Sequence, residues 1–299
     1  MSKTQENEKV LVALLRFNYE IQTFRRSAWL RSPLWIYLLI ALLLRIWLIV
    51  HTQGVIDGDG SLVGIQAEHI LRGEHPVYFY GQVYLGSLGA YLVAMLFAIA
   101  GPAVWVLRSE PVLLSLVLVY LTWKLAALLA EMASLPPAAQ SYFMNIAALL
   151  AAIAPLYDTV LAMRLLSGYI EIFVLILILF IAALRLIQRW GSNASTLELA
   201  FRWAGIGFIL GLGFWINPLI ISAVLATACW FTVYCIAEII RLLRHGKTSS
   251  GRSASSFLLS FSAILAVFPV FVVGSAPALY WGATHHWDNV TYLLQRGEG

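Results

Sequence analysis

The chain has 299 residues, of which 61% are hydrophobic and only 11% are charged. A soluble globular protein carries about 25% charged residues to keep its surface in water, so this composition excludes that class and favours a membrane protein. The formal net charge of +4 requires no nucleic acid partner, because membrane proteins collect basic residues in their cytoplasmic loops.

Residues 1–33 form a polar, amphipathic segment in front of the first apolar stretch. Lys and Arg are retained on the cytoplasmic side of membranes, so we expect this segment and the N-terminus to be cytoplasmic. The basic residues that lead to this prediction are Lys3, Lys9, Arg16, Arg25, Arg26 and Arg31.

Seven later stretches are long and apolar enough to cross a bilayer, which takes roughly 20 residues of helix. They are residues 34–50, 109–130, 138–157, 169–188, 199–216, 219–241 and 257–275. Three basic residues within them, Arg45, Lys124 and Arg202, are interpreted as charges that face the bundle or reach toward the interface. The sequence therefore predicts an all-α polytopic membrane protein of about seven transmembrane helices, a module over 34–275 in the plasma membrane.

An eighth apolar stretch, residues 83–106, is interrupted by glycines and a proline. Basic residues mark the later loops 189–198 and 241–252 as cytoplasmic, and counting crossings back from them places both ends of 83–106 on the outer side. We therefore expect this stretch to be a re-entrant or juxtamembrane helix within an outer loop over 51–108.

Four segments are predicted on the outer side, where they can converge on one site: 51–108, 158–168, 216–218 and 276–299. The last is semi-polar and stops in a Gly-Glu-Gly sequence. We expect it to be the start of a second outer loop that is cut short.

The first outer segment begins with two carboxylates, Asp57 and Asp59, each followed by a glycine. Glycine lets the backbone turn sharply, so both carboxylates can approach one cation or one acceptor hydroxyl. The alternative is a solvated turn, because Asp-Gly is common in turns.

Further along this segment lie Arg72, Tyr80, Gln82 and Tyr84. Aromatic residues at a membrane interface commonly anchor the protein there. The faces of aromatic rings also bind sugar rings and prenyl chains, so Tyr80 and Tyr84 are candidates for substrate binding. Arg72 and Gln82, polar residues of the same segment, are candidates with them.

The remaining candidates for substrate binding are polar residues of the other outer segments: Asp158, Arg164, Glu171, Asn217 and Arg296. Ionisable groups near or within lipid are costly and are functional candidates by default. An ion pair between Glu171 and Arg164 is the structural alternative, and Asn217 can also serve the helix break at the following proline.

The order of these motifs resembles the N-terminal half of the GT-C glycosyltransferases, the membrane class that includes protein mannosyltransferases and lipid A aminoarabinose transferases. Gly60 and Gly89 stand where that family usually has glutamate. The segments that carry the resemblance are Asp57-Gly58-Asp59-Gly60, His69-Ile70-Leu71-Arg72-Gly73-Glu74-His75-Pro76, Tyr80-Gly81-Gln82-Val83-Tyr84-Leu85-Gly86-Ser87-Leu88-Gly89-Ala90-Tyr91, Gly168-Tyr169-Ile170-Glu171 and Trp215-Ile216-Asn217-Pro218-Leu219.

The resemblance implies a glycosyltransferase that takes a sugar from a polyprenyl-phosphate donor in the outer leaflet of the lipid bilayer. Asp59 matches the loop aspartate of the family, which acts as catalytic base or as metal ligand, and Asp57 is its neighbour. The second role would involve a divalent cation, Mg or Mn, held by both aspartates. The acceptor would be a glycan, a lipid or a protein, and direct attack of its hydroxyl on the anomeric carbon would invert that centre.

Two other functions remain open at this point. Intramembrane charges and the break at Asn217-Pro218 also occur in transporters, although no inverted repeat is apparent. Gly60 and Gly89 favour a catalytically degenerate protein that binds a lipid-linked sugar without transferring it.

Overall fold

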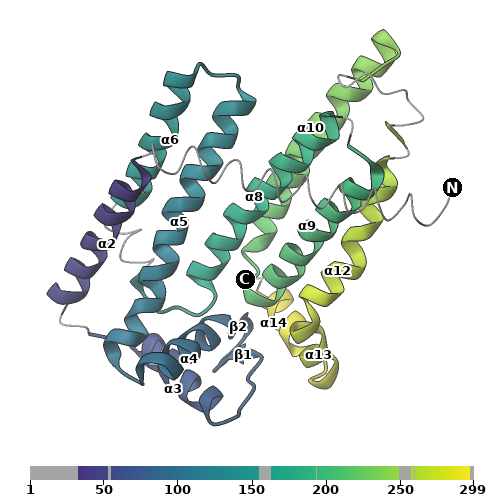
Figure 1. Ribbon diagram of the computed structural model, residues 1–299. Coiled ribbons are helices and arrows are strands. Elements are labelled where there is room, and N and C mark those ends of the chain that lie inside the picture. Colours follow the sequence, from purple (N-terminus) through teal and green to yellow (C-terminus); the bar gives the residue numbers. More distant parts are fainter. Residues whose placement is uncertain are drawn as a thin grey trace, which may run out of the picture.

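A computed structural model describes residues 33–52, 55–154, 163–192, 194–248, 257–258 and 260–296, which form helices and one two-stranded hairpin (Figure 1). The elements are α2 (Leu34–His51), α3 (Gly58–Leu71), β1 (Tyr78–Phe79), β2 (Gln82–Gly86), α4 (Leu88–Ala100), α5 (Val104–Met132), α6 (Pro137–Ala152), α8 (Tyr169–Gly191), α9 (Thr196–Ile216), α10 (Ile220–His245), η1 (Phe261–Ala266, a 3₁₀ helix), α12 (Val267–Gly274), α13 (Ala276–Thr284) and α14 (Asp288–Arg296).

Five helices of the described chain, α2, α5, α8, α9 and α10, are long and apolar enough to cross a membrane. A sixth span results if Phe261–Gly274 and Ala276–Thr284 form one crossing with a bend of 59°. The protein is therefore a helical membrane protein, and the count of seven crossings stays a prediction. The counterpart of the predicted span 138–157 is α6, whose 16 residues extend over about 24 Å.

The stretch 83–106 holds the end of the hairpin and α4. The 13 residues of α4 extend over about 20 Å, less than the roughly 30 Å of hydrocarbon that a single span must cross. Gly101, with φ of 82°, ends this helix, and α5 begins at Val104 instead of the predicted residue 109. Residue 108, the predicted end of the outer loop, therefore lies inside α5, because the helix is continuous from Val104 to Met132.

Arg45 lies well inside α2, and its side chain is only 3% exposed. Its guanidinium donates hydrogen bonds to the Ser115 hydroxyl of α5 at 3.0 Å and to the carbonyl of Ala152, the last residue of α6. The carbonyls at a helix C-terminus lack intrahelical partners and carry partial negative charge, which a cation stabilises. Arg45 therefore faces the bundle, where it joins α2, α5 and α6.

Helices α9 and α12 pack with their backbones in contact. A Cβ atom on Gly211 of α9 would lie 2.2 Å from the carbonyl oxygen of Phe271, and one on Gly274 of α12 would lie 2.6 Å from that of Phe208. Small residues that allow such close approach are a common means of helix association in lipid. This contact fixes α12, which leads directly into α13.

Helices α3, α4, α13 and α14 and the hairpin gather at one end of the bundle; we call these elements the cap (Figure 1). Tyr78 of β1 joins its early and late parts, because its ring packs edge-on against Trp281 with centroids 5.0 Å apart. The hydroxyl of Tyr78 also accepts a 2.8 Å hydrogen bond from Asn289. The two longest of the predicted outer segments are thus side by side.

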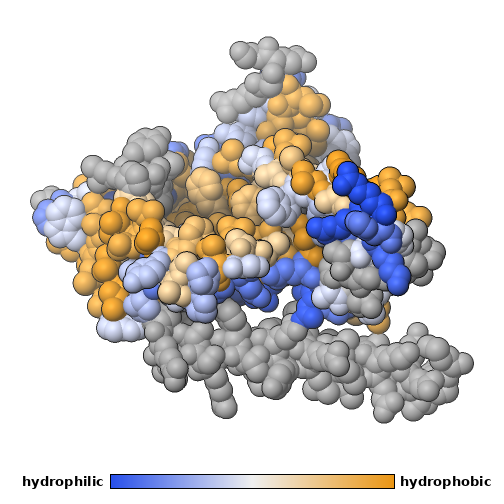
Figure 2. Space-filling model, turned by 90° about the horizontal axis from the view of Figure 1, so that it is seen from above, coloured by the Kyte–Doolittle hydropathy of each residue, from blue (hydrophilic) through white to orange (hydrophobic). Residues whose placement is uncertain are grey.

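Apolar residues cover much of the described surface seen from above in Figure 2. Helix α10 is an extreme case: large side chains such as Ile221, Leu225 and Val233 are exposed along it. In water this exposure would be unfavourable, whereas in a bilayer the same side chains face acyl chains. The surface therefore agrees with a membrane-embedded bundle.

Candidate functional site

The first helix of the cap, α3, begins at Asp57, whose carboxylate has two separate tasks. One oxygen accepts the N–H of Gly60 at 2.9 Å, a typical N-cap hydrogen bond. The other oxygen accepts hydrogen bonds from Nε and Nη2 of Arg164 at 2.8 and 2.7 Å. This ion pair brings together two predicted site segments that are 107 positions apart in the chain.

The surroundings of Asp57 keep its carboxyl ionised. Burial raises the pKa of Asp57, but the hydrogen bonds from Gly60 and Arg164 and the charges of Arg164 and Arg108 lower it by more, so the pKa lies below its ordinary value. Asp57 is therefore a carboxylate at neutral pH. Since both of its oxygens are engaged, it orders the loop and Arg164.

Asp59 differs from Asp57 although it lies only two residues away. It occupies the first turn of α3 and is half-buried. Within the described part of the chain it forms no hydrogen bond or ion pair. Its carboxyl group is therefore free, among the described residues, to contact a bound substrate.

A second cation, Arg108, lies beside this pair at the start of α5. Its Nη2 donates to the carbonyl of Val55, and its charge acts on Asp57. Its Nε is buried and has no hydrogen-bond partner among the described residues. Arg108 is not among the sequence-predicted site residues, although a cation at the outer end of a predicted span was an available signal.

Glu171 lies in the first turn of α8 and is 6% exposed. It forms no ion pair with Arg164, so the structural alternative considered from the sequence does not hold in the structure. Its Oε2 atom is buried and lacks a hydrogen-bond partner within the described ranges.

Gly60 and Gly89, the two departures from the resembled pattern, are both tightly packed. A Cβ atom on Gly89 would lie 2.2 Å from Oε1 of Glu171, and one on Gly60 would lie 2.5 Å from Cγ2 of Ile56. The carboxylate of Glu171 thus fills the space that a side chain at position 89 would need. These glycines are part of the packing of the cap against the bundle.

Glu110 of α5 is a further buried carboxyl that the sequence predictions missed. It is 4% exposed, and its charge acts on Glu171 across the contact between α5 and α8. Its Oε1 atom has no partner among the residues that the structure describes. The available signal was an acidic residue at the start of the predicted span 109–130, because intramembrane carboxyls are rare and usually functional.

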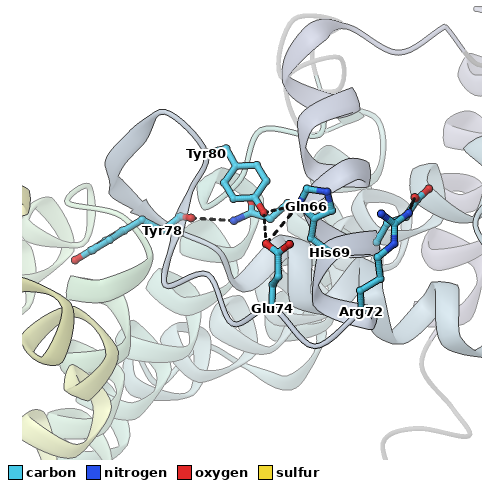
Figure 3. Close-up of polar contacts among 7 residues, drawn as sticks. Gln66, His69, Arg72, Glu74, Tyr78 and Tyr80 are labelled. Atoms are coloured by element: carbon cyan, nitrogen blue, oxygen red, sulfur yellow. Dashed lines mark hydrogen bonds and ion pairs between the residues drawn. The ribbon is translucent and has the colours of Figure 1, made fainter.

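Two predicted residues, Arg72 and Tyr80, lie in the polar cluster around the end of α3 (Figure 3). Arg72 follows the C-terminus of α3 and pairs with Glu68 at 3.1 Å. The hydroxyl of Tyr80 donates to Glu74 at 3.1 Å and lies 2.8 Å from Nδ1 of His69. Since α3 is about 21 Å long, this cluster and Asp57 are at opposite ends of the helix, and the structure does not bring Arg72 and Tyr80 together with the aspartates.

Asn217 has a structural explanation within the bundle. It is buried, its Oδ1 accepts the N–H of Leu219 at 2.9 Å, and its Nδ2 donates to the carbonyl of Gly168 at 3.3 Å. Asn217 therefore holds the break between α9 and α10 against the turn that precedes Glu171. It positions a site residue through the backbone.

Of the four remaining predicted residues, the structure describes the side chains of two, Tyr84 and Gln82. Tyr84 stacks on Tyr292 of α14 with ring centroids 5.2 Å apart, so its face is covered by the cap itself. Gln82 is half-buried at the start of β2. Asp158 and the side chain of Arg296 lie outside the described residues.

The described residues do not offer a ready divalent-cation site. No three His, Cys, Asp or Glu side chains in the described ranges lie close enough to hold a metal ion together. Mg²⁺ and similar cations prefer several oxygen ligands, but both oxygens of Asp57 are already engaged by Gly60 and Arg164. In this arrangement the positive charge beside Asp57 comes from Arg164 and Arg108, and a cation held by Asp57 and Asp59 stays a prediction.

Comparisons of the chain with protein-family models, with curated proteins and with solved structures found no match. The resemblance to the GT-C glycosyltransferases therefore remains a prediction from the motifs. The contacts of Asp57, Asp59, Arg108 and Arg164 are what bear on function.

Proposed function

We propose that the protein is a membrane glycosyltransferase that moves a sugar from a polyprenyl-phosphate donor to an acceptor hydroxyl, with Asp59 as the general base. The observation that carries the proposal is the ion pair between Asp57 and Arg164. It joins the aspartate motif that carries the GT-C resemblance to Arg164 of a second predicted outer segment, and it leaves Asp59 beside it without a hydrogen-bond or ion-pair partner among the described residues.

The two aspartates have separate roles in the proposed reaction. The acceptor oxygen attacks the anomeric carbon while its proton passes to the carboxylate of Asp59, a transfer that requires a separation of about 3 Å. The bond from the anomeric carbon to the phosphate oxygen breaks, and the configuration at that carbon inverts. Asp57 does not exchange a proton, because its low pKa and its bonds to Gly60 and Arg164 keep it ionised.

The leaving group is a polyprenyl phosphate, which departs with negative charge. Arg164 and Arg108 flank Asp57, and Nε of Arg108 has no partner within the described residues. Guanidinium groups bind phosphate through charge-assisted hydrogen bonds. We assign to these two arginines the task of stabilising the departing phosphate, a task for which Arg72 lies too far along α3.

The location of the site suits a donor that is itself a lipid. Asp57 and Asp59 lie where α3 begins beside the cap-side ends of α5 and α8, so a prenyl chain in the bilayer can bring its sugar to them. The proposal places the cap on the extracytoplasmic side of the plasma membrane and the N-terminus in the cytoplasm. The acceptor, a glycan, a lipid or a protein, approaches from the aqueous side.

The test is transfer by the purified full chain in lipid nanodiscs, supplied with labelled polyprenyl-phosphate hexoses and a crude envelope acceptor. Asp59→Asn should reduce the rate of sugar release from the donor by about 10²- to 10⁴-fold, the usual contribution of a general base. Its thermal unfolding should match that of the wild type, because Asp59 forms no hydrogen bond or ion pair within the described chain.

The matched control is Ser61→Ala, which changes the same turn of α3 at a residue whose hydroxyl bonds only to the carbonyl of Asp57. Undiminished transfer by Asp59→Asn would refute the assignment of the base. Tight donor binding without transfer by the wild type would instead indicate a lipid-linked-sugar binding protein. A parallel reaction with EDTA tests the Mg or Mn requirement, and we expect no loss of rate because Asp57 is engaged by Arg164.

A further inference from the structure

The end of the α5–α8 pair away from the cap carries two cations, Lys124 of α5 and Arg185 of α8. They lie beside the apolar cluster in which Leu121 and Leu128 of α5 pack with Ile181 and Leu184 of α8, and the charge of Arg185 acts on Lys124. Nζ of Lys124 lies 5.7 Å from the ring centroid of Tyr120, and Nε of Arg185 is buried without a hydrogen-bond partner among the described residues. Neither cation forms an ion pair within that part of the chain.

The depth of this pair corresponds to the edge of a leaflet. Lys124 lies eight positions before Met132, the end of α5, and Arg185 lies six positions before Gly191, the end of α8. These intervals correspond to about 12 Å and about 9 Å along the helices. Long basic side chains at such a depth can reach the headgroup region of the leaflet opposite the cap.

Acidic side chains of the protein do not neutralise the pair in the described structure. Glu131, further along α5, is exposed beyond it, near the end of the helix. Glu198 is engaged by Arg202 at 3.0 Å and by Arg189 at 3.7 Å. Two cations within apolar helices are unfavourable without a counter-charge, and the described residues supply none, so an anion of the surrounding lipid can take this role.

We propose that Lys124 and Arg185 form a binding site for the phosphate group of an anionic lipid in the leaflet opposite the cap. The guanidinium offers a planar set of donors that matches phosphate oxygens, and the ammonium adds a point charge. Basic pockets between transmembrane helices are known as a means of holding such headgroups. The site is independent of the proposed sugar transfer, which takes place at the cap.

The test measures binding of phosphatidylglycerol and of phosphatidylcholine to the full chain in neutral detergent, by native mass spectrometry and by the shift in the unfolding midpoint. Phosphatidylglycerol should bind and raise the midpoint, and phosphatidylcholine should not. The double variant Lys124→Met, Arg185→Met should bind phosphatidylglycerol roughly 10- to 100-fold more weakly, because it loses charge-assisted hydrogen bonds to the phosphate. Methionine keeps an unbranched apolar stem at both positions, so most of the packing of α5 on α8 is preserved.

The matched control removes two exposed cations near the end of α10, Arg244→Gln and Lys247→Gln. It should leave phosphatidylglycerol binding unchanged. Equal loss in both double variants, or no loss in the first, would overturn the proposal. Inorganic phosphate separates the two sources of the anion: if it alone raises the midpoint and phosphatidylglycerol adds nothing, the site is not a lipid site.

Discussion

The α5–α8 pair has two acidic side chains at its cap end and two basic side chains at its other end. Near the cap, Glu110 of α5 lies near Glu171 of α8, and at the other end Lys124 of α5 lies near Arg185 of α8. On both helices the second charge follows the first by 14 positions, about 21 Å or nearly four turns, so all four lie along one helix–helix contact.

The difference between the ends lies in what covers them. The carboxylate of Glu171 is packed against Gly89 of the cap, and Glu110 is similarly buried. Lys124 and Arg185 are only half-buried, and α5 and α8 leave this end through the connections 133–136 and 192–195. An acidic pair enclosed by protein has to be accommodated within the fold, whereas a basic pair near the leaflet edge can take its counter-charge from the lipid.

The acidic end of the α5–α8 pair can be covered only if the cap is fixed to the bundle. We expect Gly211→Val to lower the free energy of unfolding by about 3 kcal/mol, at the upper end for overpacking, because the new side chain would meet backbone atoms of α12. Thermal unfolding of the purified protein measures this effect. The control is Gly205→Ala on the same helix, where a Cβ meets nothing within 4 Å and stability should rise by up to about 1 kcal/mol. Equal destabilisation by both changes would contradict the role of the α9–α12 contact.

The acidic end offers a second test. Glu110→Gln replaces a buried carboxyl, whose Oε1 has no partner among the described residues, with an amide that can donate a hydrogen bond to Glu171, so the free energy of unfolding should rise by roughly 1–3 kcal/mol. Chemical denaturation in detergent measures the change. Glu131→Gln on the same helix is exposed and should stay within about 0.5 kcal/mol of the wild type. Destabilisation by Glu110→Gln would show that the carboxyl group of Glu110 itself contributes to the stability of the fold.

The smallest expected effect concerns pH at the start of α3. The folded pKa of Asp57 lies below its unfolded value of about 3.9. Its contribution to stability is therefore complete above that unfolded value and is lost as the pH falls through the folded pKa. Because the side chain is 37% exposed, solvent screening limits the contribution to less than about 1 kcal/mol.

Asp57→Asn isolates this contribution, since asparagine also caps helices but cannot ionise. Unfolding midpoints at pH 7 and pH 3 should differ less in the variant than in the wild type. An identical pH dependence of both proteins would mean that the ion pair with Arg164 adds nothing to stability.

Much of the fold could be predicted because the signals are local. The predicted spans 34–50 and 199–216 correspond closely to α2 and α9. An apolar run of about 20 residues suffices to place a helix in lipid, since every backbone group is satisfied within the helix. Whether Phe261–Gly274 and Ala276–Thr284 form one bent span is a matter of tertiary packing, which a run of apolar residues does not determine.

The candidate site could be predicted only in part. Asp57, Asp59, Arg164 and Glu171 were singled out from their residue types and positions, but the partner of Arg164 was uncertain. Glu110 was missed altogether, since its importance depends on a carboxylate 61 positions later, Glu171, on another helix.

By itself the sequence determined that the protein resides in lipid and how long most of its helices are, because hydrophobicity acts on each segment independently. Only the tertiary structure decided that Asp57 meets Arg164 while Asp59 stays unpaired among the described residues, and that α5 and α8 align an acidic pair at one end with a basic pair at the other. Coulomb and hydrogen-bond energies depend on distances of a few ångströms between side chains far apart in the chain, and those distances exist only once the helices have packed.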